Sequence, residues 1–184
     1  MFRRMARRRW QQAIMTNEQL ALLNQANQLQ TSGQFGQAAP LFARLAQEMA
    51  NSNHPRRSAN LHAQAAHCYA DSGDATNALS HARAALNLFI QYQMVERTPR
   101  FYTNITNKFH ARGMDQAAAS LQAEFSGKIG VIPATPQSVQ PKPRGHLPGA
   151  CPKCGAPVRS DDVDWIDEVS AECPYCGIVL ETAH

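Results

Sequence analysis

Three glycines, Gly33, Gly73 and Gly113, follow one another at intervals of forty residues, in segments that align without gaps. Around each glycine, three further positions repeat with the same period: a small residue seven before it, a large apolar residue four before it and an alanine five after it. These are Ala26, Leu29 and Ala38; Ala66, Tyr69 and Ala78; and Thr106, Phe109 and Ala118. Glycine ends a helix at little steric cost, and a fixed period of this length indicates stacked units of one kind. The pattern therefore predicts a row of helical hairpins.

Helix start signals fix the ends of these hairpins. Thr16 and Gln19 form a capping-box pattern, and Pro55 suits the first turn of a helix. Thr98 followed by Pro99 is expected to open the fifth helix as cap and first-turn proline, and Asp74 and Asp115 are expected to cap the second helices of their pairs. The sequence predicts six helices in three antiparallel pairs, over residues 17–31, 35–51, 55–71, 75–94, 98–111 and 115–126.

The repeat resembles the tetratricopeptide family over residues 17–126. The first copy matches that family best, with Ala26, Gly33, Phe35, Ala38 and Phe42, whereas the third copy is weak and the period is forty rather than thirty-four. A plain six-helix bundle is the alternative. The resemblance implies a groove, lined by the first helix of each pair, that holds a peptide or a partner helix.

The polar residues that would line this groove are two repeated columns and two neighbours: Asn27, Gln30, Asn60, His67, Arg100, Asn107 and His110. The alternative is that they are ordinary polar surface residues. The histidines have no nucleophile or carboxylate at a catalytic spacing, and the chain has no phosphate-binding glycine loop and no HExxH motif. We therefore expect no enzymatic activity.

Four of the five cysteines form two Cys-Pro-x-Cys-Gly units eighteen residues apart: Cys151, Cys154, Cys173 and Cys176. Two residues between thiolates let both sulfurs face one ion, and this spacing falls within the pattern of zinc sites. Four sulfur ligands leave no open position for water, which predicts one structural Zn²⁺. A segment of about 35 residues is too short to fold on its core alone, so the metal would supply the missing stability.

Residues 150–181 resemble the zinc ribbons, which implies a small β-sheet. Val163 and Trp165 alternate with aspartates, and Ile178, Val179 and Leu180 suggest a further strand. The knuckles also resemble those of rubredoxin, which would imply an iron electron carrier, but rubredoxins space their knuckles more widely and surround them with more aromatics. Gly155 and Gly177, after each second cysteine, are expected to permit the turn and to leave backbone N–H groups free to point at sulfur.

Charge and composition divide the rest of the chain. Residues 1–14 carry five arginines, residues 128–149 are rich in proline, and the last 35 residues hold seven acidic and two basic groups. We predict a basic arm over residues 1–14 (disordered, or translated from a start codon placed too early), a helical domain over 15–127, a linker over 128–149 and a zinc ribbon over 150–184. Ile129 to Ile132 would be an extra contact between linker and repeats.

These features favour a protein–protein interaction adaptor with a protein or peptide partner. A nucleic-acid-associated factor that uses the arginine arm is the alternative, although the acidic residues of the ribbon would repel phosphate. A hairpin array this short is also compatible with a homo-oligomer. The reducing conditions that suit paired metal-binding cysteines, and the absence of a membrane-length apolar run or a signal sequence, predict a cytoplasmic protein.

Overall fold

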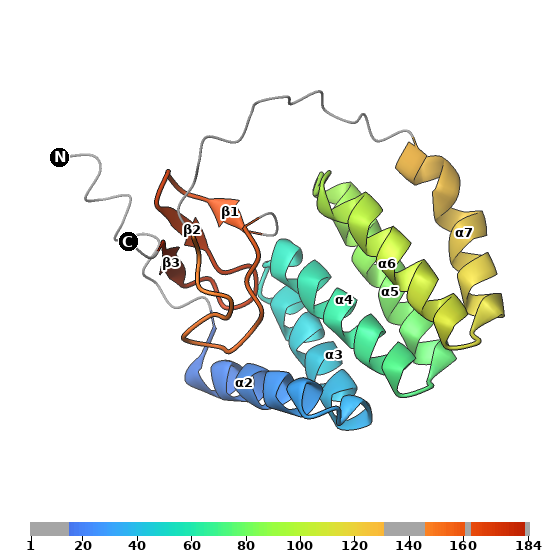
Figure 1. Cartoon of the computed structure of the whole chain (residues 1–184), viewed down its shortest axis with the longest axis horizontal. Helices are drawn as coiled ribbons and strands as arrows, with labels where there is room; N and C mark the ends of the chain where they lie inside the picture. Colours follow the sequence, from blue (N-terminus) through green and yellow to red (C-terminus); the bar gives the residue numbers. More distant parts are fainter. Residues whose placement is uncertain (1–14, 131–145, 161–162, 183–184) are drawn as a thin grey trace. The chain divides into compact units, whose positions relative to one another are not determined.

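A computed structural model describes residues 15–130, 146–160 and 163–182 (Figure 1). The basic arm, most of the proline-rich segment and two hairpin residues lie outside the described residues. The described chain is mainly helical with one small antiparallel sheet near its C-terminus, as the sequence predicts. The helices are α2 (Asn17–Thr31), α3 (Phe35–Asn51), α4 (Pro55–Asp71), α5 (Ala75–Gln91), α6 (Arg97–Ala111) and α7 (Asp115–Gly130).

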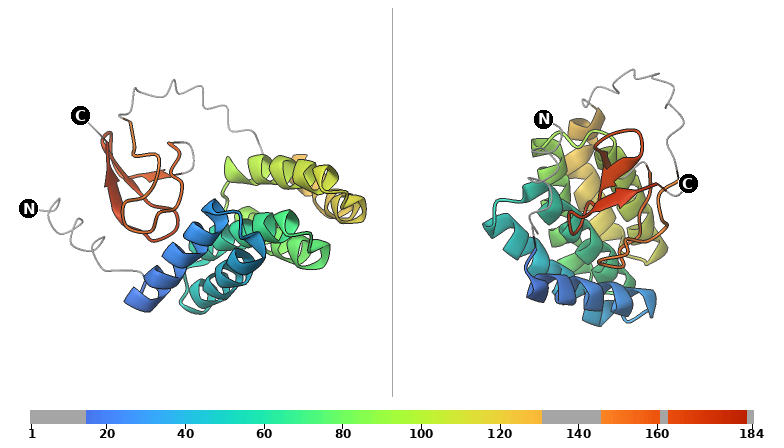
Figure 2. Two further views of the ribbon diagram at one scale, coloured as in Figure 1. Left: turned by 60° about the horizontal axis from the view of Figure 1, so that its bottom comes forward. Right: turned by 90° about the vertical axis from the view of Figure 1, so that its left-hand side faces the viewer.

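The described residues fall into two compact units. One contains the residues up to Asn27 together with those from Gln137 onward, and the other contains Gln28–Pro136. The boundary therefore falls inside α2, whose first three turns belong to the unit that holds the sheet. Within the second unit, each helix from α3 to α7 packs against the next, and α4 also contacts α6 while α5 contacts α7 (Figures 1 and 2).

All five turns between the helices have one geometry. A residue with positive φ stands at every twentieth position, and the N–H of the following residue donates to the carbonyl five residues earlier. The positive-φ residues are Gly33, Asn53, Gly73, Gln93 and Gly113, and the bonds run from Gln34, His54, Asp74, Met94 and Met114. This is the Schellman arrangement, which satisfies the last carbonyls of a helix. The true spacing of the chain is therefore twenty residues, half the repeat visible in the glycines.

The repeated columns lie where the sequence places them. Ala26, Ala66 and Thr106 are buried, and so are Ala38, Ala78 and Ala118. Small side chains at these positions allow neighbouring helices to approach closely. Of the large column, Phe109 is fully buried and Tyr69 packs partly buried against the same core. That core joins α4, α5, α6 and α7 and ends on Leu121 and Phe125 of the last helix.

Two of the predicted helix starts are confirmed by their hydrogen bonds. At α2, the N–H of Thr16 donates to Gln19 Oε1 at 3.0 Å and the N–H of Gln19 donates to Thr16 Oγ1 at 3.2 Å, which is the expected capping box. At α5, the carboxylate of Asp74 accepts the side-chain amide of Asn77 at 2.7 Å and its backbone N–H at 3.0 Å. The side-chain bond, and secondarily the backbone bond, lower the pKa of Asp74. Pro55 is the first residue of α4.

The predicted cap at Thr98 is wrong. Helix α6 begins at Arg97, and Thr98 is buried inside its first turn, where its hydroxyl donates to the carbonyl of Met94 at 2.9 Å. Helix α5 also ends at Gln91 rather than at residue 94, because Gln93 takes φ of 52° and turns the chain. Asp115 is already the first residue of α7, and its carboxylate lies 2.8 Å from His110 Nδ1.

The last helix runs further than the composition suggests. Helix α7 continues to Gly130, so Lys128 and Ile129 are helical although the linker was predicted to start at residue 128. Ile129 packs partly buried against the core of the helical unit. The contact predicted for Ile129 therefore exists, but on a helix and not on an extended strand; Val131 and Ile132 lie outside the described residues.

The sheet has three short antiparallel strands in sequence order, β1 (Asp164–Trp165), β2 (Ser170–Glu172) and β3 (Val179–Glu181). Asp164 pairs with Glu172 and Trp165 with Ala171, and Ala171 in turn pairs with Leu180. Ala171 and Leu180 are buried, whereas Val163 and Trp165 are half-buried on either side of exposed Asp164. The expected alternation of burial at residues 163–165 is present, but the two inward-facing side chains are only half-buried.

No helix within the described ranges has both the length and the apolar character needed to cross a membrane.

Candidate metal centre

The two Cys-x-x-Cys segments fold into the same hairpin-like knuckle. In the first, the N–H of Cys151 donates to the carbonyl of Ala156 at 2.8 Å and the N–H of Gly155 donates back to the carbonyl of Cys151 at 2.9 Å. In the second, Cys173 donates to Ile178 at 2.9 Å and Gly177 to Cys173 at 3.0 Å. This shared pattern follows from the shared Cys-Pro-x-Cys-Gly sequence.

The glycines permit the turn that closes each knuckle. Gly155 has φ of 70° and Gly177 has φ of 77°, a region that side-chain-bearing residues rarely adopt. The N–H groups of the two glycines themselves donate to the carbonyl of the first cysteine of their own knuckle. The bonds fix the backbone shape that turns both sulfurs of a knuckle toward the same point.

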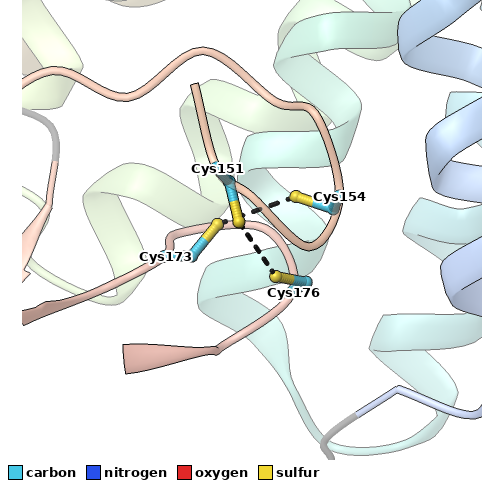
Figure 3. A group of neighbouring side chains, drawn as sticks. All are labelled: Cys151, Cys154, Cys173 and Cys176. Carbon is cyan, nitrogen blue, oxygen red and sulfur yellow. Dashed lines mark hydrogen bonds between the residues drawn. The ribbon is translucent and has the colours of Figure 1, made fainter. Parts of the chain in front are cut away.

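The four sulfurs converge from the two knuckles (Figure 3). Their Sγ atoms all lie within 4.8 Å of one another, and all four residues are buried. The Sγ atoms of Cys151 and Cys176 are 3.7 Å apart, and those of Cys154 and Cys173 are 3.8 Å apart. Across the described residues, no other group of three or more potential ligands gathers in this way.

These distances fit a single tetrahedrally bound ion and exclude a disulfide. A disulfide requires sulfurs about 2.0 Å apart, and all five cysteines are unpaired. Sulfurs about 2.3 Å from a central ion at the corners of a tetrahedron are about 3.8 Å apart, which matches both measured pairs. The residues present can therefore hold one metal ion with four sulfur ligands.

The electrostatics of the cluster also favour a cation. Hydrogen bonds from the neighbouring sulfurs, first among them Cys154, lower the pKa of the Cys151 thiol far below its usual range. Hydrogen bonding to Cys151 raises the pKa of the Cys154 and Cys176 thiols far above it. The four sulfurs therefore do not ionise alike, and a positive ion among them would favour the thiolate form of all four.

The turn between β1 and β2, in the segment that joins the two knuckles, is stabilised by one carboxylate. Asp167 Oδ1 accepts the N–H groups of Val169 and Ser170 at 3.0 and 2.8 Å and the Ser170 hydroxyl at 2.7 Å. Trp165 donates its indole N–H to the carbonyl of Ser160 at 2.8 Å. The hairpin between the knuckles is therefore ordered by its own polar groups rather than by a large core.

The residues predicted to line a groove have several different environments. Asn60 is buried and accepts a hydrogen bond from Arg97 Nη1 at 2.5 Å, and Gln30 donates to Gln64 at 3.0 Å. His67 packs edge-on against Phe101 with ring centroids 5.4 Å apart. Arg100 is half-buried, and Asn107 and His110 are exposed. The groove itself stays a prediction.

Asn27 has a role that the repeat pattern does not reveal. Its side chain is 7% exposed, and its Nδ2 donates to the carbonyl of Cys154 at 2.7 Å. One turn earlier, Asn24 Nδ2 donates to the carbonyl of Lys153 at 3.3 Å. Sequence reasoning missed Asn24 and assigned Asn27 only to the groove, because the contact joins residues more than 120 positions apart.

A pair of histidines inside the helical unit was also missed. His62 Nδ1 and His81 Nδ1, on α4 and α5, are 2.8 Å apart, and the His81 ring stacks on Tyr69 with centroids 5.3 Å apart. Burial and the charge of His81 lower the pKa of His62 to about 4. The two half-buried neutral rings are joined by one hydrogen bond, and they are a packing feature of this helix pair.

Cys68 is separate from the metal centre and is fully buried on α4. Burial, and secondarily the charge of Asp71, raise the pKa of its thiol to about 12. A thiol that stays protonated is a poor nucleophile and a poor metal ligand, so Cys68 is a packing residue of α4.

Comparison of the chain with protein-family models, with curated proteins and with solved structures finds no match.

Proposed function

We propose that this protein is a non-enzymatic adaptor, in which a ribbon built around one structural Zn²⁺ accompanies a helical repeat array that binds a protein partner. The observation that carries the metal assignment is the 3.7 and 3.8 Å separation of the paired sulfurs, the edge length expected for tetrahedral zinc. Four sulfur ligands leave no position for a reacting water, so the metal supplies stability rather than chemistry.

Zinc is favoured over iron by the surroundings of the site. The spacing between the knuckles is shorter than the resemblance to rubredoxin would require, and only Trp165 and Tyr175 supply aromatic rings near it in the sequence. Elemental analysis distinguishes the two metals directly, and an iron–thiolate protein would be coloured.

The surface of the hairpin supports a protein partner rather than a nucleic acid. Ile166 and Val169 are 41% and 54% exposed, and they are the exposed large apolar side chains of the described residues. Asp167 and Glu168 lie between them, and both are exposed. An apolar pair with carboxylates between them suits a protein surface that offers an apolar contact ringed by basic groups, whereas the carboxylates would repel phosphate.

Polar side chains of α6, the first helix of the third pair, also support a protein partner. Asn107 and His110 project exposed from α6, and half-buried Arg100 belongs to the same helix. These side chains can donate and accept hydrogen bonds without rearrangement of the core. The cytoplasm, with its reduced thiols, is the compartment in which such a zinc site is stable.

The experiment is affinity capture by the zinc-loaded chain, with partners quantified by mass spectrometry, followed by a binding titration with the purified partner. Asn107→Arg on α6 and the pair Ile166→Ser with Val169→Ser on the hairpin should each weaken capture of that partner. Gln116→Arg, the same charge change at an exposed position on α7, is the matched control. A partner retained equally by all variants would contradict both surfaces, and turnover by the pure chain would contradict a non-enzymatic role.

A further inference from the structure

Helix α2 contacts the first knuckle through two asparagines on one face. Asn24 and Asn27 are three residues apart, so both amides project to the same side of the helix. They donate to consecutive carbonyls, Lys153 at 3.3 Å and Cys154 at 2.7 Å. These two carbonyls lie within the Cys-x-x-Cys segment and just before Gly155, whose missing side chain leaves Asn24 Oδ1 3.9 Å from the position that a Cβ would occupy.

The stronger of the two bonds is buried. Asn27 is 7% exposed and Cys154 is fully buried, so water has little access to the amide or to the carbonyl it faces. A buried amide that loses its acceptor is costly, which means that α2 in this position depends on the carbonyl of Cys154 being presented correctly. The same unit contains both partners of the bond.

The closed knuckle presents this carbonyl to Asn27. The bond from the Gly155 N–H to the Cys151 carbonyl turns the Lys153 and Cys154 peptides outward, and two thiolates held by one ion keep that turn closed. Without an ion, the four buried sulfurs, which all lie within 4.8 Å of one another, lack a common partner. Metal-dependent closure of short cysteine segments is the rule in small zinc domains.

We infer that Asn27 is a positioning residue of the metal centre, and that closure of the first knuckle around the metal holds the N-terminal turns of α2. The hydrogen bond acts in both directions. It fixes the peptide of a ligand cysteine and so slows metal release, and metal occupancy in turn protects α2 from local unfolding. Partners outside the ligand shell commonly change metal affinity by about 10–100-fold. This inference rests on the proposed zinc occupancy.

The test uses the full chain loaded with zinc. Asn27→Asp keeps the size of the side chain but replaces the N–H donors by a carboxylate that faces a carbonyl. Asn104→Asp makes the same chemical change at an exposed position of α6. Zinc transfer to a coloured chelator should be about tenfold faster in the Asn27 variant, and unchanged in the Asn104 variant.

Hydrogen exchange on the unsubstituted protein gives a second measurement that needs no variant. On removal of zinc, the amides of α2 from Leu20 to Asn27 should lose protection, while those in α4 to α7 keep theirs. Equal zinc transfer rates in the Asn27 variant and the parent, or unchanged α2 protection after zinc removal, would overturn the inference. Elemental analysis of the parent is performed first, so that absence of bound zinc is recognised as failure of the proposed function itself.

Discussion

Gly73 and Gln93 occupy the same place in consecutive helix turns, with φ of 89° and 52°. Each is followed by a residue whose N–H donates to the carbonyl five positions back, from Asp74 to Tyr69 and from Met94 to Phe89. The fold thus demands a left-handed residue at both positions, and only one of them is glycine. The four turns other than that at Gln93 use glycine or, at position 53, asparagine, the residues that tolerate this region best.

Replacing Gln93 by glycine should stabilise the helical unit. A left-handed conformation costs an ordinary residue about 1–2 kcal/mol, whereas the added flexibility of glycine costs about 0.5–1 kcal/mol. We expect Gln93→Gly to raise the free energy of unfolding by about 0.5–1 kcal/mol, measured by urea denaturation. Gly73→Ala is the matched opposite: it should lower that free energy by a similar amount, although nothing lies within 4 Å of the added Cβ. A neutral result for both would show that the turns are not under conformational strain.

Asp71 joins α4 to the third hairpin through two cations. Its carboxylate accepts from Arg112 Nη2 at 2.8 Å and forms an ion pair with Lys108, and its side chain is only 12% exposed. Asp71→Ala should cost about 2 kcal/mol, because a largely buried, doubly bonded charge is lost. Glu48→Ala, which removes the exposed pair with Arg44 at 2.8 Å, should cost no more than about 0.5 kcal/mol. Equal losses in urea melts would contradict this ranking.

The helical unit should lose stability in mild acid. Burial lowers the pKa of His62 and of His67 to about 4, with the charges of His81 and Lys108 adding to the effect. Because the unfolded chain binds protons near the ordinary pKa of 6.5, stability is complete above pH 6.5 and falls as the pH drops from 6.5 toward 4. His62→Gln should flatten this part of the curve of unfolding free energy against pH, when helical signal is followed in urea. An identical slope in variant and parent would exclude His62 as a source.

Removal of one cysteine ligand should unfold the sheet and leave the helical unit folded. Cys173→Ser should release the metal and abolish the ordered signals of β1 to β3. Helices α4 to α7 share a core and α3 packs against α4, so far-UV helicity should fall by no more than the contribution of α2. Loss of most of the helical signal together with the metal would show that the helical unit cannot fold without the ribbon.

The helices and the four-sulfur cluster were predictable because their signals lie close together in the sequence. The glycine period and the cap at Thr16 predict helix ends that the structure confirms, and the Cys-Pro-x-Cys-Gly units predict the four-sulfur cluster. Local signals also explain the errors: Thr98-Pro99 looks like a helix start, but Met94 provides the acceptor that places Thr98 inside the turn. At Gly127 and Gly130, helix α7 continues through residues that usually weaken a helix, since Ile129 has a core contact.

Long-range contacts could not be predicted in this way. Neither the bond from Asn27 to Cys154 nor the pairing of His62 with His81 leaves a periodic signal, because each joins polar residues on different elements. The positive φ of Gln93 is equally hidden, since glutamine does not mark a turn. The twenty-residue spacing of the turns, which places Gln93 midway between Gly73 and Gly113, appears only in the structure.

The most direct test of this account is the metal content of the purified full chain, measured by elemental analysis together with amide NMR of residues 146–182. The account predicts one zinc per chain, little or no iron, and dispersed signals that collapse when a chelator removes the zinc. A chain that contains no metal while these residues still give dispersed signals would contradict it.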